Sequence, residues 1–327
     1  MKVSELLEQR RQNWHELERL CEQGVMRRRR AGAAVVARFG TLYRAACADL
    51  ALADSYQLPP DTVQYLHRLV GRAHNQLYRT KPFNVSTWIE VLLMEAPQRI
   101  FQDRCVQLAF CIFWGAFLLS FFLAFSKGLF PRYAEQMIGQ EMIEQLESSF
   151  SSTIHGRDAS ESYAMAGFYI QHNTGIGFKC FASGLLVIPG LFMCLYNAAV
   201  LGGAFGYMAR PDVAEGVNFF HFVTAHGPFE LTAIVLAAGS GLRLGWSWIS
   251  TRGMTRLASL RATAVYCMPI IGAMMVLFFL AALIEGFLSP SSAPYSVKAA
   301  VAILSSGALM FYFVVLGFPR SSGSAIG

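Results

Sequence analysis

Long apolar segments dominate the last two-thirds of the chain, and their lengths predict membrane-spanning helices. Residues 105–125, 264–288 and 297–318 form three nearly uncharged runs, each close to the ~20 residues that a helix needs to cross the hydrocarbon core of a bilayer. Two further spans are expected at 175–195 and 228–249. The pattern therefore predicts an all-α, polytopic membrane protein.

The segment between the spans expected at 175–195 and 228–249 is the most difficult to assign to a membrane topology. Residues 198–208 are apolar and glycine-rich but number only eleven, which at 1.5 Å per residue is too short for a full crossing. A crossing is still required here if 228–249 is to end in the cytoplasm beside Arg252 and Arg256. We expect a broken or tilted helix, with 214–227 partly re-entrant and shielded by the bundle. The predicted count is about six transmembrane helices, with both termini in the cytoplasm.

Residues 1–104 are expected to form a basic, helical domain in the cytoplasm. They include 16 Lys/Arg and 11 Asp/Glu, and the chain begins without the apolar run and cleavage site of a signal peptide. Within this domain, 27–30 is a run of four arginines, and 88–100 is expected to form an amphipathic helix against the inner leaflet. Apolar residues at helical spacing predict three helices, with stripes at Trp14, Leu17, Leu20 and Cys21; at Phe39, Leu42, Tyr43, Ala46 and Leu50; and at Leu66, Leu69, Val70, Ala73 and Leu77.

The transmembrane core, 105–318, contains a long polar loop at 127–170 that is expected outside the cytoplasm. The loop holds six acidic residues against three basic ones, and a loop poor in Lys and Arg is typical of the side opposite the cytoplasm. Apolar residues spaced along 138–150 predict an amphipathic helix that lies on the outer leaflet or holds a protein partner. Residues 319–327 are expected to form a short cytoplasmic tail.

Composition excludes several classes of protein. The 327 residues are 54% hydrophobic and only 15% charged, against roughly 25% charged in an average soluble protein, which excludes a soluble globular enzyme, a disordered chain and a coiled coil. The net charge of +6 is explained by basic residues beside membrane spans, so it does not indicate nucleic-acid binding. Seven cysteines without a CxxC pair favour neither a disulfide framework nor a zinc ribbon.

The strongest local feature is the sequence His-Gly-Pro-Phe-Glu at 226–230, at the start of an apolar span. A carboxylate inside the membrane costs roughly 2.5–3.5 kcal/mol on insertion scales, so Glu230 should face the protein interior. One interpretation is a proton or cation site, or a hydrogen-bonded lock that His226 and Glu230 place on the re-entrant segment. The other is that Glu230 caps the start of its helix. Glu285, near the end of the fifth span, either reaches water at the interface or shares an outward-facing polar cavity with Glu230.

Several other polar residues are weaker candidates for function. Asn173, Lys179, Asn197 and His172 are candidates for the lining of that cavity, and Arg243 lies at the far end of the same span as Glu230.

His221, His226 and Glu230 do not match a metal-binding motif, because histidines five apart do not share a helical face. We therefore assign no metal, no cofactor and no catalytic residue. Glycines at four-residue spacing predict close helix packing, and the packing set comprises Gly202, Gly206, Gly227, Gly241 and Gly245.

Three sequence blocks resemble the stage II sporulation protein M family of integral membrane proteins, also called DUF95. They are the stretch from Asn197 to Gly206, the block from His226 to Gly245 and the ALIEGFLSP ending of the fifth span. The segments RRQNWHELERL, LYRAACADLALA and LHRLVGRAHNQLY resemble long-form members from non-sporulating bacteria. The resemblance implies a protein of the bacterial cytoplasmic (inner) membrane. The family's namesake works with a lytic transglycosylase and an amidase that remodel peptidoglycan, and long-form relatives are typically encoded beside a MoxR-type AAA+ ATPase.

From the sequence we expect a non-catalytic membrane scaffold linked to remodelling of the cell envelope. Residues 1–104 would bind a cytoplasmic partner such as the ATPase, and 127–170 would bind a protein outside the membrane. Membrane lipids are the other expected partners, and self-association into a homo-oligomer is left open. The alternative hypothesis is a transporter, flippase or channel that uses Glu230 and Glu285.

Overall fold

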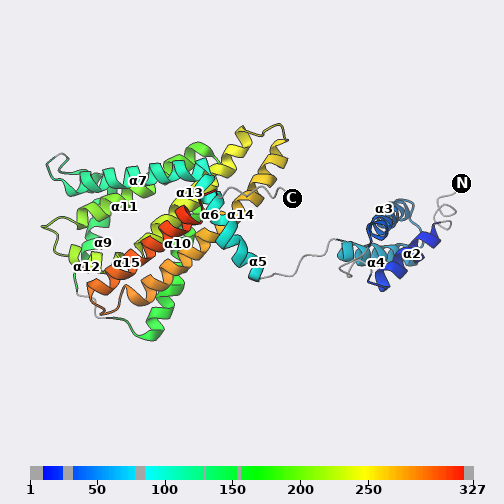
Figure 1. Cartoon of the computed structure of the whole chain (residues 1–327), viewed down its shortest axis with the longest axis horizontal. Helices are drawn as coiled ribbons and strands as arrows, with labels where there is room; N and C mark the ends of the chain where they lie inside the picture. The colour runs from blue at the N-terminus through cyan, green and yellow to red at the C-terminus, as the bar shows by residue number, and fades with distance from the viewer. Residues whose placement is uncertain (1–9, 25–31, 78–84, 129, 153–155, 320–327) are drawn as a thin grey trace, which may run out of the picture. The chain divides into compact units, whose positions relative to one another are not determined.

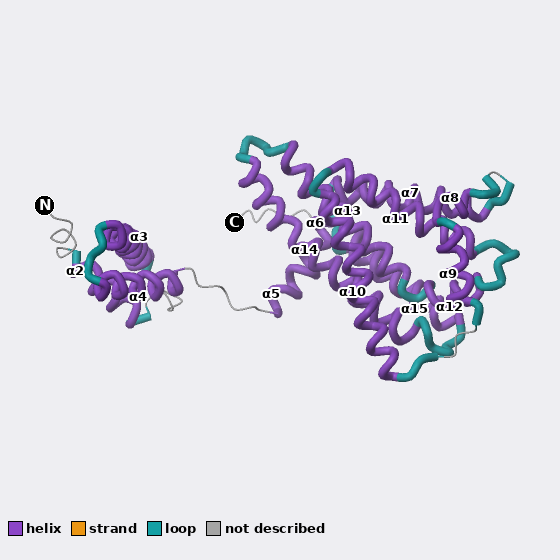
Figure 2. Tube along the Cα trace, turned by 180° about the vertical axis from the view of Figure 1, so that it is seen from behind, coloured by secondary structure: helices purple, strands orange, loops and turns teal. Residues whose placement is uncertain are grey.

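The chain divides into two compact units, 1–84 and 85–327, and all regular elements that the structure describes are helices (Figures 1 and 2). The predicted arginine run 27–30 and all but the first residue of the predicted tail 319–327 lie outside the described residues. The structure, a computed structural model, describes residues 10–24, 32–77, 85–128, 130–152 and 156–319.

In the described part of the first unit, three helices share one core. They are α2 (Arg11–Glu22), α3 (Ala33–Ser55) and α4 (Pro60–Leu77). The three predicted apolar stripes meet in this core, where Leu17, Phe39 and Leu66 are fully buried. The repeat of apolar residues at helical spacing thus brings the three helices together by burying their apolar faces.

A carboxylate is buried in the same core. Asp49 is fully shielded from solvent; one of its oxygens accepts a hydrogen bond of 2.8 Å from the indole nitrogen of Trp14, and the other pairs with the Arg10 guanidinium. A buried charge is tolerated when its oxygens are engaged in this way. Asp49 therefore connects α3 to α2 and to the residue just before it.

The second unit begins with a short helical segment made of α5 (Val85–Glu90), the π-helix η2 (Val91–Glu95) and α6 (Ala96–Gln102). The side chains of Ala96 and Ile100 are buried in the core of this unit. Arg99 donates a hydrogen bond of 2.7 Å to the carbonyl oxygen of Tyr266. The end of the predicted amphipathic segment 88–100 is thus packed on the long helices of the same unit, whereas Ile89, Leu93 and Met94 are exposed. Its position against the inner leaflet stays a prediction.

The long helices of the second unit are suited to crossing a membrane. By length and composition, α7, α11, α14 with η3, and α15 with η4 are candidate spans, and the bent pair formed by α12 (Gly216–Val223) and α13 adds a fifth. The two helices of that pair meet at an angle of 68°. The long helices and their π-helical extensions are α7 (Arg104–Phe125), α10 (Ala159–Gly184), α11 (Val187–Met208), α13 (Gly227–Ile249), α14 (Arg256–Leu283), η3 (Ile284–Leu288), α15 (Tyr295–Met310) and η4 (Phe311–Val315).

The central helix of this unit is α13, in which 14 of 23 residues are buried. It packs against α7, α10, α11 and α14. Small residues permit the close approach: a Cβ atom on Gly241 would lie 2.3 Å from the Phe181 carbonyl oxygen of α10, and one on Gly245 would lie 2.1 Å from the Gly184 oxygen. Because an added Cβ would collide with a backbone oxygen of α10 at both positions, glycine fits there and larger residues do not.

A second glycine contact joins α11 to α7, which lie side by side (Figure 1). A Cβ atom on Gly202 or Gly206 would lie 2.2 Å from the carbonyl oxygens of Phe117 and Phe121, respectively. Gly227 does not belong to this group: a Cβ atom there would meet nothing within 4 Å, because the residue stands at the start of α13, outside the packed helix faces.

The predicted spans at 175–195 and 198–208 differ from the helices that form. Helix α10 ends at Gly184 and α11 begins at Val187, so the turn falls inside the first predicted span and α11 is a full-length helix of 22 residues. The turn consists of apolar residues, and Pro189 follows in the first turn of α11, where a missing N–H costs no hydrogen bond. The short broken helix expected at 198–208 is therefore wrong, because these residues complete α11. The segment expected to be partly re-entrant, 214–227, contains α12 and the bend before α13.

The loop 127–170 is largely helical and packs on the end of the bundle. It contains α8 (Tyr133–Ile138), α9 (Gln140–Phe150) and the first part of α10. The prediction was one amphipathic helix of about five turns, but Gly139, at φ +84°, divides this stretch into α8 and α9. Its apolar residues Ile143, Leu146 and Phe150 pack within two small clusters of this chain. Part of the face that we expected on the outer leaflet or a partner thus packs against the chain itself, while Met142 is exposed; its binding to either stays a prediction.

Candidate functional site

The break between α12 and α13 places two polar side chains inside the second unit. Helix α13 begins at Gly227, with Pro228 in its first turn, where proline fits without loss of a hydrogen bond. His226 is the residue before the helix, and the backbone N–H of Glu230 donates to its carbonyl oxygen, 3.2 Å away. The two side chains therefore lie one turn apart on the same side, as the sequence predicted for a helix that begins before Pro228.

A third polar side chain reaches the same place from another helix. Glu285 lies in η3, the π-helical end of α14, and π-helical turns are frequently found at functional sites. One ligand-type atom from each of His226, Glu230 and Glu285 lies within 4.8 Å of the other two. His226 Nε2 is 3.6 Å from a Glu230 carboxylate oxygen. His226 and Glu285 are buried, and the Glu230 side chain is 20% exposed.

Neighbouring polar groups hold two of these side chains in place. Ser289 Oγ and His226 Nδ1 share a hydrogen bond of 2.9 Å, which leaves Nε2 facing Glu230. Asn173 of α10 donates a hydrogen bond of 3.0 Å to a Glu285 carboxylate oxygen. Fixing the far side of a histidine ring and of a carboxylate in this way is typical of ion-binding sites, because it sets the direction of the free lone pairs.

The carboxylates of the cluster have no lysine or arginine within ion-pair distance in the described part of the chain. Among the residues that the structure describes, the single ion-pair contact of either carboxylate is the one between His226 and Glu230. Lys298 is fully buried nearby, but its ammonium group donates to the carbonyl oxygens of Ser289 and Ser291, at 2.7 and 3.0 Å. The start of α13 offers only the partial positive charge of a helix dipole. Arg157, just before α10, adds positive charge that acts on Glu285 from beyond ion-pair distance. A shared proton or a bound cation would supply the rest of the balance.

The two structural interpretations of these carboxylates do not fit the observed contacts. In the described part of the chain, no backbone N–H donates to the Glu230 carboxylate, so Glu230 does not cap its helix. Glu285 does not reach water at the interface, because it is only 8% exposed and bonded to Asn173. Both side chains face the interior of the unit.

Other predicted candidates lie away from the cluster. Asn197 donates to the Met193 carbonyl oxygen of its own helix at 2.8 Å, Lys179 is exposed, and His172 stacks on Phe168. His221 stands against Tyr295, with ring centroids 5.0 Å apart, and does not join His226. Of the four predicted lining residues, Asn173 alone contacts the cluster.

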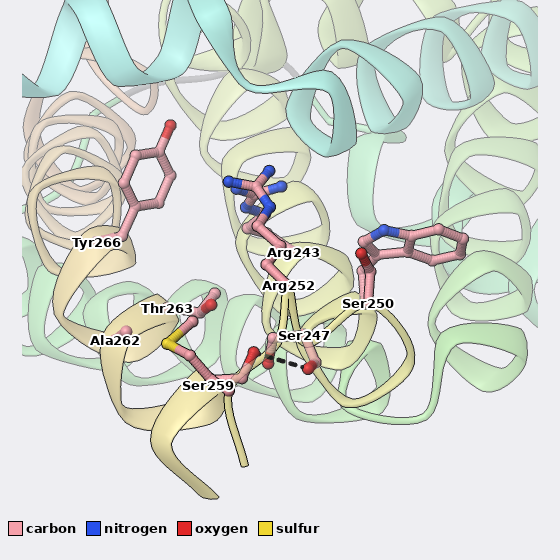
Figure 3. A pocket seen from close by; sticks show the side chains of 10 residues that line it. Arg243, Ser247, Ser250, Arg252, Ser259, Ala262, Thr263 and Tyr266 are labelled. Carbon is pink, nitrogen blue, oxygen red and sulfur yellow. Dashed lines mark hydrogen bonds between the residues drawn. The ribbon is translucent and has the colours of Figure 1, made fainter. Parts of the chain in front are cut away.

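Arg243 lies at the opposite end of α13. Its Nε is 3.2 Å from a carboxylate oxygen of Asp103, whose other oxygen accepts from the backbone N–H groups of Cys105 and Val106 at the start of α7. Arg243 also lines a pocket between α13 and α14 (Figure 3). Sequence reasoning missed Asp103, Ser289 and Lys298. Of these, only Lys298 could have been identified from the sequence, because it is a charged residue within an apolar run.

Comparisons with known families cover both units. A family described as stage II sporulation protein M matches residues 105–290, and a family described as a domain of unknown function, DUF8413, matches residues 4–79. No curated protein matches the chain significantly. No solved structure does so either.

Proposed function

Because the chain belongs to the stage II sporulation protein M family of membrane proteins, we propose that its second unit is a cation transporter of the bacterial cytoplasmic membrane. The cation, a proton or a metal ion, is bound between His226, Glu230 and Glu285. The proposal rests chiefly on one observation: two carboxylates lie together inside the unit at the break of a helix, and among the described residues neither forms an ion pair with a lysine or arginine.

The position of the cluster supports this function. Transporters of several folds bind their coupling ions where a helix is interrupted, since the interrupted backbone provides polar groups inside the membrane. Here α12 and α13 meet at 68°, and the cluster lies at their junction. A rigid-body change at this junction would move His226 and Glu230 relative to Glu285, which comes from a different helix.

We further propose six crossings, with both termini in the cytoplasm. Helix α10 would be the sixth span: its 26 residues are long enough, although its composition is less apolar than that of the others. Arg252, Arg256 and Arg261 favour a cytoplasmic position for the turn between α13 and α14. The cation cluster, at the other end of α13, would then lie toward the outer side.

Flux measurements on the full chain in lipid vesicles test the proposal. We expect wild-type vesicles to take up protons or a divalent cation, followed with a pH-sensitive and a metal-sensitive dye inside. Glu230→Gln and Glu285→Gln should each reduce this flux to the level of empty vesicles. Glu144→Gln, a control at an exposed carboxylate of α9, should leave it unchanged. Equal flux in all variants, or no flux in any, would refute the transport proposal.

The scaffold function is a second candidate, and the first unit favours it. This unit has its own core and its own family match, which is the arrangement expected of a module that binds a separate partner. We propose that it binds a cytoplasmic protein, with a MoxR-type ATPase as the first to test, and that the protein couples this partner to remodelling of the cell envelope.

Affinity purification from membranes separates the two functions. Loss of a partner when 1–84 is deleted, together with its retention in Glu285→Gln, would support the scaffold. Recovery of the same proteins with and without 1–84 would contradict it.

A further inference from the structure

A pocket with two arginines in its lining lies where the end of α13 faces the start of α14, at the opposite end of α13 from the cation cluster. Its volume is about 180 Å³, several times the ~30 Å³ that one water molecule occupies in the liquid. The lining includes Arg243, Trp246 and Ser250 from α13 and its end, and Thr263 and Tyr266 from α14. The cavity is therefore large enough for a small polar group.

Two arginines line this pocket. Arg243 comes from α13 and Arg252 from the loop that follows it, and Figure 3 shows both guanidinium groups turned to the same side of the pocket. The Arg243 guanidinium carbon lies 5.3 Å from the centroid of the Tyr266 ring. Arg252 has a φ of +51°, a backbone conformation that residues other than glycine seldom adopt and that is often retained where side-chain position matters for function.

The pocket has an excess of positive charge. Asp103 pairs with Arg243, but the lining itself contains no Asp or Glu. Arg252 has neither an ion pair nor a hydrogen bond with any described residue. Arg99, whose guanidinium stands over the Tyr266 ring, already forms an ion pair with Glu95. Because Asp103 pairs with Arg243, the positive charge of Arg252 remains without a counter-charge among the described residues.

Hydroxyl donors accompany this charge. Ser259 donates to the Ser247 carbonyl oxygen at 2.9 Å, and Ser247 donates to its own helix, so these two hydroxyls are already engaged (Figure 3). The hydroxyls of Ser250 and Thr263 make no hydrogen bond with the described residues and remain able to donate to a ligand.

We propose that this pocket binds a phosphate group, either in the headgroup of an anionic phospholipid or as a free phosphate. A guanidinium presents parallel N–H donors that match two phosphate oxygens, and the hydroxyls of Ser250 and Thr263 would reach the others. Basic pockets between membrane helices are known to hold anionic lipid headgroups. The site is separate from the cation cluster and does not depend on transport.

The test uses the full chain in nanodiscs of neutral phosphatidylcholine, with phosphatidylglycerol or inorganic phosphate added, and tryptophan fluorescence as the readout. Arg252→Gln should weaken binding of the anionic lipid about tenfold, the loss expected for a charge-assisted contact. Arg261→Gln, an exposed arginine of α14 outside the pocket, should change it less than twofold. Since Arg243→Gln would leave Asp103 without its partner, Arg243→Lys is the second pocket variant and should give an intermediate loss.

The two phosphate sources are separated by competition. If inorganic phosphate displaces the lipid, the phosphate group alone is recognised; if the lipid binds and inorganic phosphate does not, the headgroup is the ligand. Equal losses in Arg252→Gln and Arg261→Gln would show that the basic surface as a whole attracts the lipid and would overturn the pocket assignment. Wild-type binding in Arg252→Gln, or no binding of either probe to the wild type, would overturn it as well.

Discussion

The repulsion between Glu230 and Glu285 can be measured through stability. One carboxylate oxygen of Glu230 lies within 4.8 Å of one of Glu285. Two unit charges at that distance repel by about 3.5 kcal/mol for an effective dielectric constant of 20. In cation-free buffer, Glu285→Gln should remove this repulsion while its amide oxygen still accepts the hydrogen bond from Asn173. The variant should therefore be more stable than the wild type, not less.

The size of the effect has an upper limit. For a unit of this length, 1 kcal/mol corresponds to a shift of about 2–4 °C in Tm, so full ionisation of both groups would give a rise of about 7–14 °C. Any proton that the wild type already shares between the carboxylates reduces the gain. We expect a rise of several degrees in neutral detergent, measured by differential scanning fluorimetry at pH 8 with a chelator present.

Addition of a divalent cation supplies the second half of the experiment. A ligand that binds only the folded state at 100 times its Kd stabilises that state by about 2.7 kcal/mol, so the wild-type Tm should rise with added Zn²⁺ or Mn²⁺. The rise should be absent in Glu285→Gln and present in the control Glu144→Gln. A lower Tm for Glu285→Gln in the chelator, with the wild-type response to metal retained, would refute the reasoning.

Three further predictions concern packing and the first unit. Gly241→Ala should lower the Tm of the full chain because its Cβ would lie 2.3 Å from a backbone oxygen of α10, whereas Gly115→Ala, with open space around it, should be neutral or slightly stabilising. Asp49→Ala should destabilise the first unit by about 1–3 kcal/mol, measured by urea unfolding followed by tryptophan fluorescence, because it leaves the buried indole N–H unpaired while the partly exposed Arg10 can turn to water; a loss below about 0.5 kcal/mol would contradict this account. The hydrogen bond from Arg72 lowers the pKa of Glu18 in the folded protein. The ionised Glu18 carboxylate therefore stabilises the fold fully above the unfolded-state pKa of ~4.3, and this stabilisation is lost as the pH falls through the lower pKa of the folded state. Circular dichroism should show that Glu18→Gln reduces this acid sensitivity, and an unchanged acid transition would count against it.

The turn between α10 and α11 shows why the predicted spans were misplaced. A hydropathy window locates membrane segments by their apolar residues and their polar ends, but this turn consists of Leu185 and Leu186, followed by Val187 and Ile188. Leu186 and Ile188 are 68% and 80% exposed, so they face outward from the unit and their apolar character conceals the break. Pro189 was the one residue that indicated a new helix here, because proline is common in the first turn of a helix.

The candidate site was only partly predictable for a related reason. The pairing of His226 with Glu230 follows from a spacing of four residues, which is a local property of a helix. The contact between Asn173 and Glu285 joins residues 112 positions apart, and helix order alone does not determine which faces meet. The sequence placed Asn173 among four candidates for the lining of a cavity shared by Glu230 and Glu285, but it did not determine which of the four contacts a carboxylate.

The buried lysine of the last candidate span bears on how the final two helices would enter a membrane. Lys298 has no exposed surface, and its ammonium group is held by carbonyl oxygens of Ser289 and Ser291, in the turn that follows α14. Released alone into lipid from the translocation channel, α15 would carry this charge without those oxygens, at a cost of a few kcal/mol if it lay deep in the bilayer. The final two helices therefore reach the bilayer most favourably as a hairpin. Insertion as a hairpin would keep the carbonyl oxygens of Ser289 and Ser291 beside this ammonium group throughout.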